Sequence, residues 1–192
     1  ADLANKSEKA KTVFFNNLSH DIRTPLNAIN GFTNMALKDI NDTVIVEESD
    51  VDGLFEANAS VAGFYVGEEV TYLDLLCGSL LPSGADASNA LARLTYGDVK
   101  SFVGKMNELC TKLGLENTQF TNPTGLHSPS HYTTCKEMAI LVQYAFNNST
   151  FKKVYETKEY VSSNGLHEWH NTLYSLSEEN DLEYDYVIGA KT

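Results

Sequence analysis

Basic side chains are scarce in this sequence, which holds 14 lysines and arginines against 26 aspartates and glutamates and has a net charge of −12. The imbalance lies in one part of the chain. Residues 1–40 contain five basic and four acidic side chains, whereas the remaining residues contain nine basic and 22 acidic ones. A face rich in lysine and arginine is needed to bind nucleic acid non-specifically or to adhere to an anionic membrane. We therefore expect the larger part of the chain to do neither.

Long apolar runs and paired cysteines are also missing. No stretch approaches the roughly 18–20 apolar residues of a membrane-spanning helix, and residues 1–6 lack the apolar centre of a signal peptide. The three cysteines cannot all pair, and none has the spacing of a metal-binding C-x-x-C motif. Cys77 and Cys110 fall on apolar helical faces, so we expect both to be small core residues.

The sequence nevertheless contains enough apolar material for a folded protein. Its hydrophobic content is 42% and its aromatic content is 10%, which excludes a disordered chain. The length suits one domain with a core, or a small domain with an appendage. The character of the sequence changes at Asn41-Asp42-Thr43. We therefore expect two parts, residues 1–42 and residues 43–192.

The first part is predicted to form one long amphipathic helix over residues 6–40. Its apolar side chains recur at intervals of three and four residues, namely Phe14, Leu18, Ile22, Leu26, Ile29 and Phe32. Pro25 lies within this stripe, so a kink is expected there. No second helix of the same kind follows, so the stripe needs a partner helix.

The second part is predicted to mix helices with short strands. The β-branched run at residues 43–47 favours a strand, and residues 48–70 are expected to be loop-like with short extended pieces. Capping boxes of the form T-x-x-D at residues 71–74 and T-x-x-E at residues 134–137 each open a helix. The expected helices span residues 72–81, 85–94, 98–113 and 135–146, with a turn at 122–125 and further strands at 158–163 and 185–190.

His20 and Asp21 form a candidate phosphate-accepting site on the first helix. A phosphoaccepting histidine needs an exposed ring, a neighbouring carboxylate that handles its proton and a rigid helix. His20 lies off the apolar stripe, so its ring should face solvent. A histidine followed by an aspartate is by itself more often an ordinary surface pair.

The longer string FFNNLSHDIRTPLNAI at residues 14–29 closely resembles the H-box of sensor histidine kinases. This resemblance covers residues 1–42 and implies that His20 is the phosphoacceptor and that Asp21 is the assisting acid. It also implies a partner kinase or partner helix and a cytoplasmic location for this part. The family's second dimerisation helix and its ATP-binding domain have no counterpart in the chain. Self-phosphorylation is therefore not expected.

The second part contains an ordered series of short motifs, each unremarkable alone. They are LCGSLLPSGADASNALA at residues 76–92, FVGKMN at 102–107, LGL at 113–115, FTNPTGL at 120–126 and HYTT at 131–134. This succession resembles the serine-type D-alanyl-D-alanine carboxypeptidases, the low-molecular-weight penicillin-binding proteins of peptidase family S11. The resemblance covers residues 43–192. It implies an incomplete α/β (α+β) fold like that of penicillin-binding proteins and β-lactamases, in which a helical lobe packs against a partial antiparallel sheet.

The resemblance also assigns roles by position. In the family, the serine of an S-x-x-K motif attacks the D-Ala-D-Ala bond, an S-x-N motif supplies a second serine, and a K-T-G motif binds the substrate carboxylate. Ser83 is then the S-x-N serine, and Lys191 and Thr192 begin the K-T-G motif. The implied ligand is a peptidoglycan stem peptide or a β-lactam, without cofactor or metal. The implied location of this part is the cell-wall side of a bacterium.

The sequence departs from that pattern at three places. Ala85 stands where the family has asparagine, although Asp86 next to it could offer a polar group. The nucleophile of S-x-x-K should lie about 20 residues before Thr43, where the kinase-like helix lies instead, and the literal match at Ser149 and Lys152 comes in the wrong order. The glycine of K-T-G is not in the chain. Hydrolysis through an acyl-enzyme is therefore expected to fail.

The histidines offer one further candidate site. His167 and His170 are three residues apart and could share a helical face and a metal ion, but no third ligand is evident. His127 and His131 flank the loop at 122–132 and are expected to be structural.

Three hypotheses stay open from the sequence. The chain is a carboxypeptidase-like domain with an incomplete site, a signalling module in which His20 receives phosphate, or a chimeric product without a joint function. Length and motif count favour the first hypothesis for the fold, whereas the missing nucleophile favours the third for the activity. We expect a sheet with few strands and the kinase-like helix in the place of the nucleophile helix.

Overall fold

The computed structural model describes residues 39–171 of the 192-residue chain. Several expectations from the sequence lie outside this range: the long helix with its kink at Pro25, the His20–Asp21 site, the strand at 185–190, and Lys191 and Thr192.

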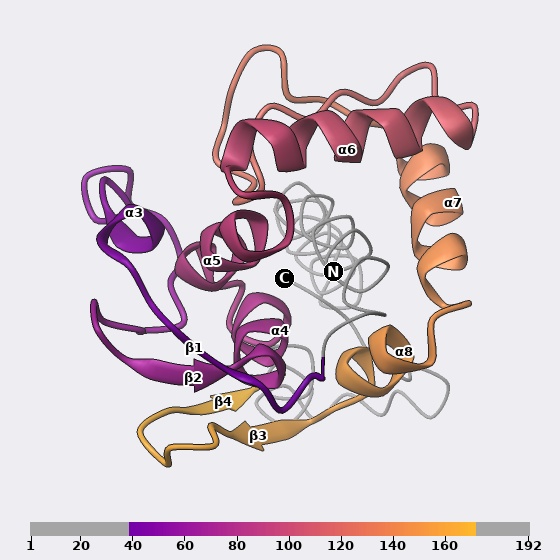
Figure 1. Ribbon diagram of the computed structural model, residues 1–192. Coiled ribbons are helices and arrows are strands. Elements are labelled where there is room, and N and C mark those ends of the chain that lie inside the picture. Colours follow the sequence, from indigo (N-terminus) through magenta and orange to yellow (C-terminus); the bar gives the residue numbers. More distant parts are fainter. Residues whose placement is uncertain (1–38, 172–192) are drawn as a thin grey trace, which may run out of the picture.

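The described chain is mostly helical and carries two small antiparallel sheets (Figure 1). Its helices are α3 (Glu48–Val51), α4 (Tyr72–Leu80), α5 (Ala85–Tyr96), α6 (Val99–Lys112), α7 (Cys135–Ala145) and α8 (Ser149–Tyr155). Its strands are β1 (Thr43–Ile45), β2 (Glu69–Thr71), β3 (Glu159–Val161) and β4 (Glu168–His170). Within residues 39–171, no helix combines the length and apolar character needed to cross a membrane.

Helix α4 lies at the centre of the described fold, beside α5 and α8 and next to both sheets (Figure 1). Eight of its nine residues are buried. The predicted capping box starts this helix: the Thr71 hydroxyl accepts a hydrogen bond from the Asp74 amide at 3.1 Å, and the Asp74 carboxylate accepts one from the Thr71 amide at 2.8 Å. Two backbone donors are thereby satisfied where the chain leaves β2.

The other helices surround α4 and supply most of the core. The largest fully buried side chains come from several elements and include Leu75, Leu91, Phe102, Met106, Leu141 and Phe151. Burying a side chain of this size stabilises the fold by about 1.5–3 kcal/mol. Cys77 and Cys110 are both buried, as predicted, whereas Cys135 is exposed. Burial raises the pKa of the Cys110 thiol to about 11, which keeps it protonated and unreactive.

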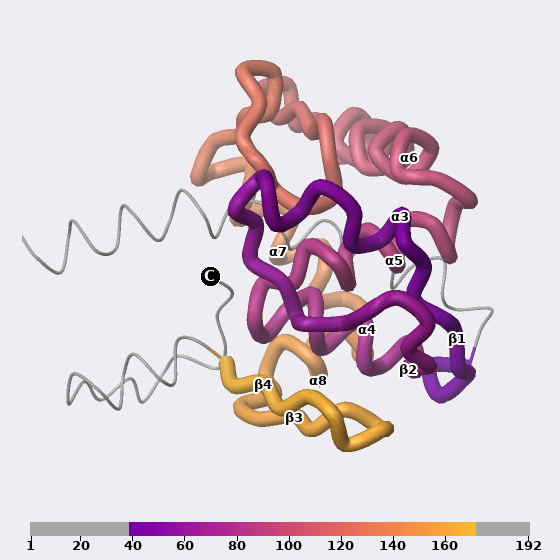
Figure 2. The backbone as a smooth tube through the Cα atoms, turned by 90° about the vertical axis from the view of Figure 1, so that its left-hand side faces the viewer, coloured from indigo at the N-terminus to yellow at the C-terminus, as the bar shows by residue number. Residues whose placement is uncertain are grey.

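The two sheets are each a two-stranded antiparallel pair. Val44 lies opposite Val70 in the first, and Tyr160 lies opposite Trp169 in the second. The tube in Figure 2 shows β3 and β4 at the end of the described chain, beside α4 and α8. The expected combination of a helical lobe with a small amount of antiparallel sheet is confirmed.

Arg93 fastens the segment after β1 onto α5. Its guanidinium donates to both carboxylate oxygens of Asp50, at 2.9 and 2.7 Å, to Glu47 at 2.9 Å and to the Ile45 carbonyl at 3.0 Å. The Asp50 side chain is 1% exposed. Hydrogen bonding to Asp50 raises the pKa of Arg93, as expected for a bidentate ion pair.

Two helices were not expected from the sequence. Helix α3 interrupts the predicted loop at 48–70, and it forms because Glu47 and Asp50 cap its first turn reciprocally. Helix α8 is capped by Asn148, the residue before it, whose side chain accepts from the Phe151 amide at 3.0 Å. Helix α5 also runs two residues further than predicted, to Tyr96.

Candidate functional site

Ser83 lies in the short turn between α4 and α5 and is partly exposed. Its φ angle is +63°, in the left-handed region. A residue other than glycine in this conformation is strained by about 1–3 kcal/mol and persists only where the surrounding structure holds it. The contacts around Ser83 therefore determine whether its hydroxyl has a fixed position.

Gly84 follows Ser83 and closes the turn against α4. Its amide donates to the Gly78 carbonyl at 2.9 Å. A Cβ at this position would lie 2.5 Å from that carbonyl oxygen and 2.7 Å from the Cβ of Ala62. Only glycine fits here without moving the backbone.

Residues 60–64, called here the support loop, pack against the start of α5. The Ala85 amide donates to the Ser60 carbonyl at 2.8 Å. The Asp86 carboxylate accepts from the amides of Ala62, Gly63 and Phe64 at 2.7, 2.9 and 3.1 Å. Asp86 is 2% exposed. It therefore does not offer a ligand the polar group that was expected next to Ala85, where the family has asparagine.

A buried pair of hydroxyls joins α4 to α5 behind the turn. The Ser79 and Ser88 hydroxyl oxygens are 2.8 Å apart, and the Ser88 hydroxyl donates to the Gly84 carbonyl at 2.9 Å. No pattern in the sequence singles out either serine. Both belong to the string at residues 76–92 that includes Ser83, and their burial identifies them as structural.

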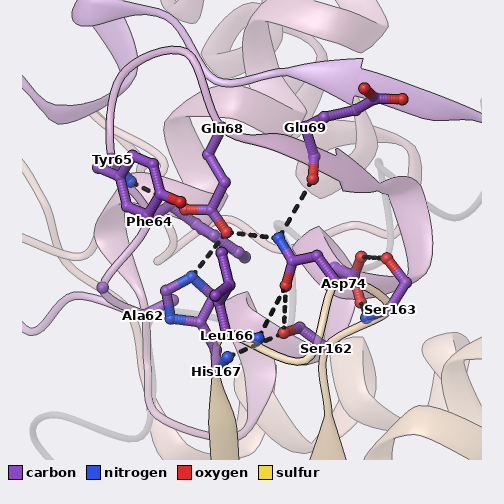
Figure 3. A network of polar contacts seen from close by, with 12 residues as sticks. Ala62, Phe64, Tyr65, Glu68, Glu69, Asp74, Ser162, Ser163, Leu166 and His167 are labelled. Carbon is purple, nitrogen blue, oxygen red and sulfur yellow. Dashed lines mark hydrogen bonds and ion pairs between the residues drawn. The ribbon is translucent and has the colours of Figure 1, made fainter.

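The β3–β4 hairpin docks on the same support loop. The Trp169 indole N–H donates to the Ala62 carbonyl at 2.9 Å. Close by, His167 Nε2 lies 2.7 Å from Glu68 Oε1, and Asn164 donates to the same oxygen at 2.8 Å (Figure 3). The His167 ring stacks on Trp169 and meets Phe64 edge to face.

Asp74 provides the second anchor of the hairpin. Its carboxylate accepts from the Tyr160 hydroxyl at 2.9 Å, from the Ser163 amide at 2.8 Å and from the Ser163 hydroxyl. Burial raises the pKa of Asp74, but the hydrogen bonds from Ser163 and Thr71 outweigh it and hold the pKa below its ordinary value. Burial, together with the bond to Asp74, raises the pKa of Tyr160.

The structure separates the residues of the suggested metal site. His167 faces inward to Glu68, whereas His170 is at the end of β4 with its ring near Glu159 and Glu168, at 3.8 and 3.7 Å. The pair lies on and beside a strand, not on one helical face. Among residues 39–171, no group of three or more histidines, cysteines or carboxylates could hold a metal ion.

The loop between α6 and α7 contains the predicted turn and His131, whereas His127 is exposed and its expected structural role stays a prediction. Asn122 accepts from the Gly125 amide at 2.7 Å and so closes the expected turn. His131 packs edge to face on Phe120 and lies 3.3 Å from the Thr121 hydroxyl. Thr134 caps α7 as predicted.

Glu137 does not complete the predicted capping box. Its carboxylate accepts instead from Asn117 and Thr118.

The literal S-x-x-K match lies on α8, where Ser149 is the first helical residue. The Lys152 side chain is 53% exposed, and its Nζ lies 3.9 Å from the carboxylate of Glu156, the residue that follows α8. This is the environment of a surface lysine.

Two features characterise the described part. It is a helical lobe with small antiparallel sheets, and it holds Ser83 in a left-handed turn just before α5. A family model for D-alanyl-D-alanine carboxypeptidase, Peptidase_S11, matches residues 32–192. The chain belongs to this family.

Relatives and solved structures agree with that assignment. A D-alanyl-D-alanine carboxypeptidase of Streptomyces sp. is 37% identical over 78% of this chain and 54% of its own length. The carboxypeptidase DacF of Bacillus subtilis is 33% identical over 77% of this chain and 39% of its own length. The crystal structure of a Streptomyces DD-transpeptidase has a TM-score of 0.75 at 33% identity and covers 88% of this chain and 69% of that one. The chain thus spans about half or less of the lengths of these curated relatives.

A second family model, the His Kinase A phospho-acceptor domain, matches residues 10–52. It confirms the resemblance of the first part to that family. The two matched ranges overlap at residues 32–52, which contain the expected seam at 41–43.

Proposed function

We propose that residues 43–192 form a ligand-binding domain of the D-alanyl-D-alanine carboxypeptidase type that does not hydrolyse its ligand. The ligand is the D-Ala-D-Ala end of a peptidoglycan stem peptide or a β-lactam. The observation that carries this proposal is the supported turn of Ser83, in a chain that belongs to the family. A domain with this ligand acts on the outer side of a bacterial cytoplasmic membrane.

The roles of the residues follow from the family's motifs. Ser83 takes the place of the S-x-N serine, and its hydroxyl hydrogen-bonds the ligand. Lys191 and Thr192 bind the ligand carboxylate, where a lysine contributes a charge-assisted hydrogen bond. Ala85 takes the place of the asparagine, and its methyl group cannot make the corresponding amide contact.

We do not propose that the domain is acylated, because acylation needs an activated nucleophile. The 82 residues before Ser83 contain no serine that is followed three residues later by a lysine. The S-x-x-K match on α8 has an exposed lysine and comes after Ser83 in the chain. The domain therefore binds the ligand reversibly.

Titration of the whole chain with an acetylated tripeptide ending in D-Ala-D-Ala tests the proposal. We expect saturable binding that Ser83→Ala weakens by about tenfold, which is the loss of one good hydrogen bond. The same peptide ending in L-Ala-L-Ala is the matched control and should not bind. Equal binding of both peptides, or no saturable binding of either, would contradict the proposed function.

A second candidate function rests on the match to the phospho-acceptor domain at residues 10–52. In this proposal, a separate histidine kinase transfers phosphate to His20, and Asp21 handles the imidazole proton. Incubation with a complete kinase and labelled ATP should give an acid-labile phosphate that His20→Gln abolishes. Label that persists in His20→Gln would exclude this role. The encoding DNA, read across residues 41–43, decides whether both parts belong to one gene or to a chimeric product.

A further inference from the structure

Asp86 is a buried carboxylate whose two oxygens are both engaged by the backbone. It is the second residue of α5 and is 2% exposed. The amides of Ala62 and Ala87 donate to Oδ1 at 2.7 and 2.9 Å. The amides of Gly63 and Phe64 donate to Oδ2 at 2.9 and 3.1 Å. One side chain thus satisfies three successive amides of the support loop and one of its own helix.

The support loop in turn forms the surface against which the Ser83 turn packs. Ala62 lies so close to Gly84 that a Cβ there would be 2.7 Å from the Ala62 Cβ and 2.8 Å from its nitrogen. The Ser60 carbonyl accepts from the Ala85 amide at 2.8 Å. The residues on the C-terminal side of Ser83 are therefore held by the loop that Asp86 fastens.

The strained backbone of Ser83 depends on the contacts that the support loop makes with Gly84 and Ala85. Its φ of +63° is unfavourable for serine and depends on the neighbouring contacts. If the support loop moves away, Gly84 and Ala85 lose their packing and hydrogen-bond partners there. Ser83 can then relax toward an ordinary conformation, which would redirect its hydroxyl.

We propose that Asp86 is a positioning residue for Ser83: it binds the amides of residues 62–64 and so fixes the serine in its ligand-binding conformation. This inference rests on the proposed function for its effect on ligand affinity. Asp86 itself does not touch the ligand, because it is buried and its four contacts are to backbone amides. Its action passes through the support loop.

The variant Asp86→Asn tests this inference. Asparagine has the same size, but its NH₂ group replaces one oxygen and can accept no hydrogen bond from the loop. In the ¹H–¹⁵N spectrum of the ligand-free chain, we expect faster hydrogen exchange at Ala62, Gly63 and Phe64, by about tenfold or more. We also expect the Ser83 resonance to shift. Released loop amides with an unchanged Ser83 resonance would overturn the inference.

Ligand affinity separates positioning from a general loss of stability. We expect Asp86→Asn to weaken binding of the D-Ala-D-Ala tripeptide by about tenfold, as in Ser83→Ala. Arg93→Lys is the matched control, because it weakens the other end of the same helix, and it should bind as the wild type does. Wild-type affinity in Asp86→Asn, or an equal loss in Arg93→Lys, would contradict the inference.

The two proposals fail in different ways. If the wild type does not bind the peptide, the proposed function fails, while the Ser83 resonance still decides whether Asp86 positions the turn. If Asp86→Asn does not fold, Asp86→Glu replaces it, because its carboxylate is retained but extends one methylene too far. We expect the same shift of the Ser83 resonance in this variant, and an unchanged resonance would again overturn the inference.

Discussion

Replacing Arg93 by lysine should destabilise the protein although the charge is kept. A lysine ammonium cannot reproduce the fork that reaches both oxygens of Asp50 and, in addition, Glu47 and the Ile45 carbonyl. Hydrogen bonds to charged groups contribute about 1.5–3 kcal/mol each when buried. The Arg93 side chain is 18% exposed and that of Asp50 only 1%. We therefore expect Arg93→Lys to lower the free energy of unfolding by about 2–3 kcal/mol.

A double-mutant cycle isolates the pair itself. Arg93→Lys and Asp50→Asn are made singly and together, and urea unfolding is followed by the fluorescence of Trp169, the one tryptophan of the chain. Because the two side chains touch, we expect a coupling energy of about 2 kcal/mol. Lys105→Ala is the control, since its pair with Glu108 is exposed and its loss should leave the midpoint unchanged. A coupling energy below about 0.5 kcal/mol would show that the Arg93–Asp50 pair does not stabilise the fold as expected.

Three further predictions concern other parts of the fold. Gly84→Ala should lower the free energy of unfolding by about 1–3 kcal/mol, because the added Cβ would overlap the backbone of α4. Urea denaturation measures this loss, and an unchanged free energy of unfolding would contradict the close packing at Gly84. Asp74 has a folded-state pKa below its ordinary value of 3.8, so its stabilising contribution is present above that pH and is lost as the pH falls through the folded value. Unfolding midpoints should therefore drop less between pH 5 and pH 2 in Asp74→Asn than in the wild type, and equal drops would exclude this role. Iodoacetamide should modify Cys135 in the native protein and leave Cys77 and Cys110 unmodified, as mass analysis of peptides would show; early labelling of either buried thiol would contradict their burial.

The elements that could be predicted from the sequence are those with local signals. The side chains of Thr71, Asp98 and Thr134 accept from amides three residues later, and each begins a helix where the sequence indicated one. Gly114 has a φ of +72° and follows the end of α6, directly after the helix that the sequence predicted over residues 98–113. Such signals act within one helical turn, so they can be recognised without knowledge of the tertiary structure.

The contacts that support the candidate site could not be predicted in this way. Asp86 meets the support loop across 22–24 residues, and Trp169 meets Ala62 across 107. No local pattern distinguishes Asp86 from an ordinary acidic residue in the first turn of a helix. The family resemblance predicted a role for Ser83, which stays a prediction, whereas its left-handed backbone and its support became visible only in the folded chain. The roles of Lys191 and Thr192 stay predictions.

The proposed function requires that the chain binds the ligand of its family without forming an acyl-enzyme. Intact-protein mass spectrometry after prolonged incubation with saturating benzylpenicillin tests it most directly. We expect an unchanged protein mass, while equilibrium titration under the same conditions shows reversible binding. A mass increase of one penicilloyl group, mapped to a serine by peptide analysis, would contradict it.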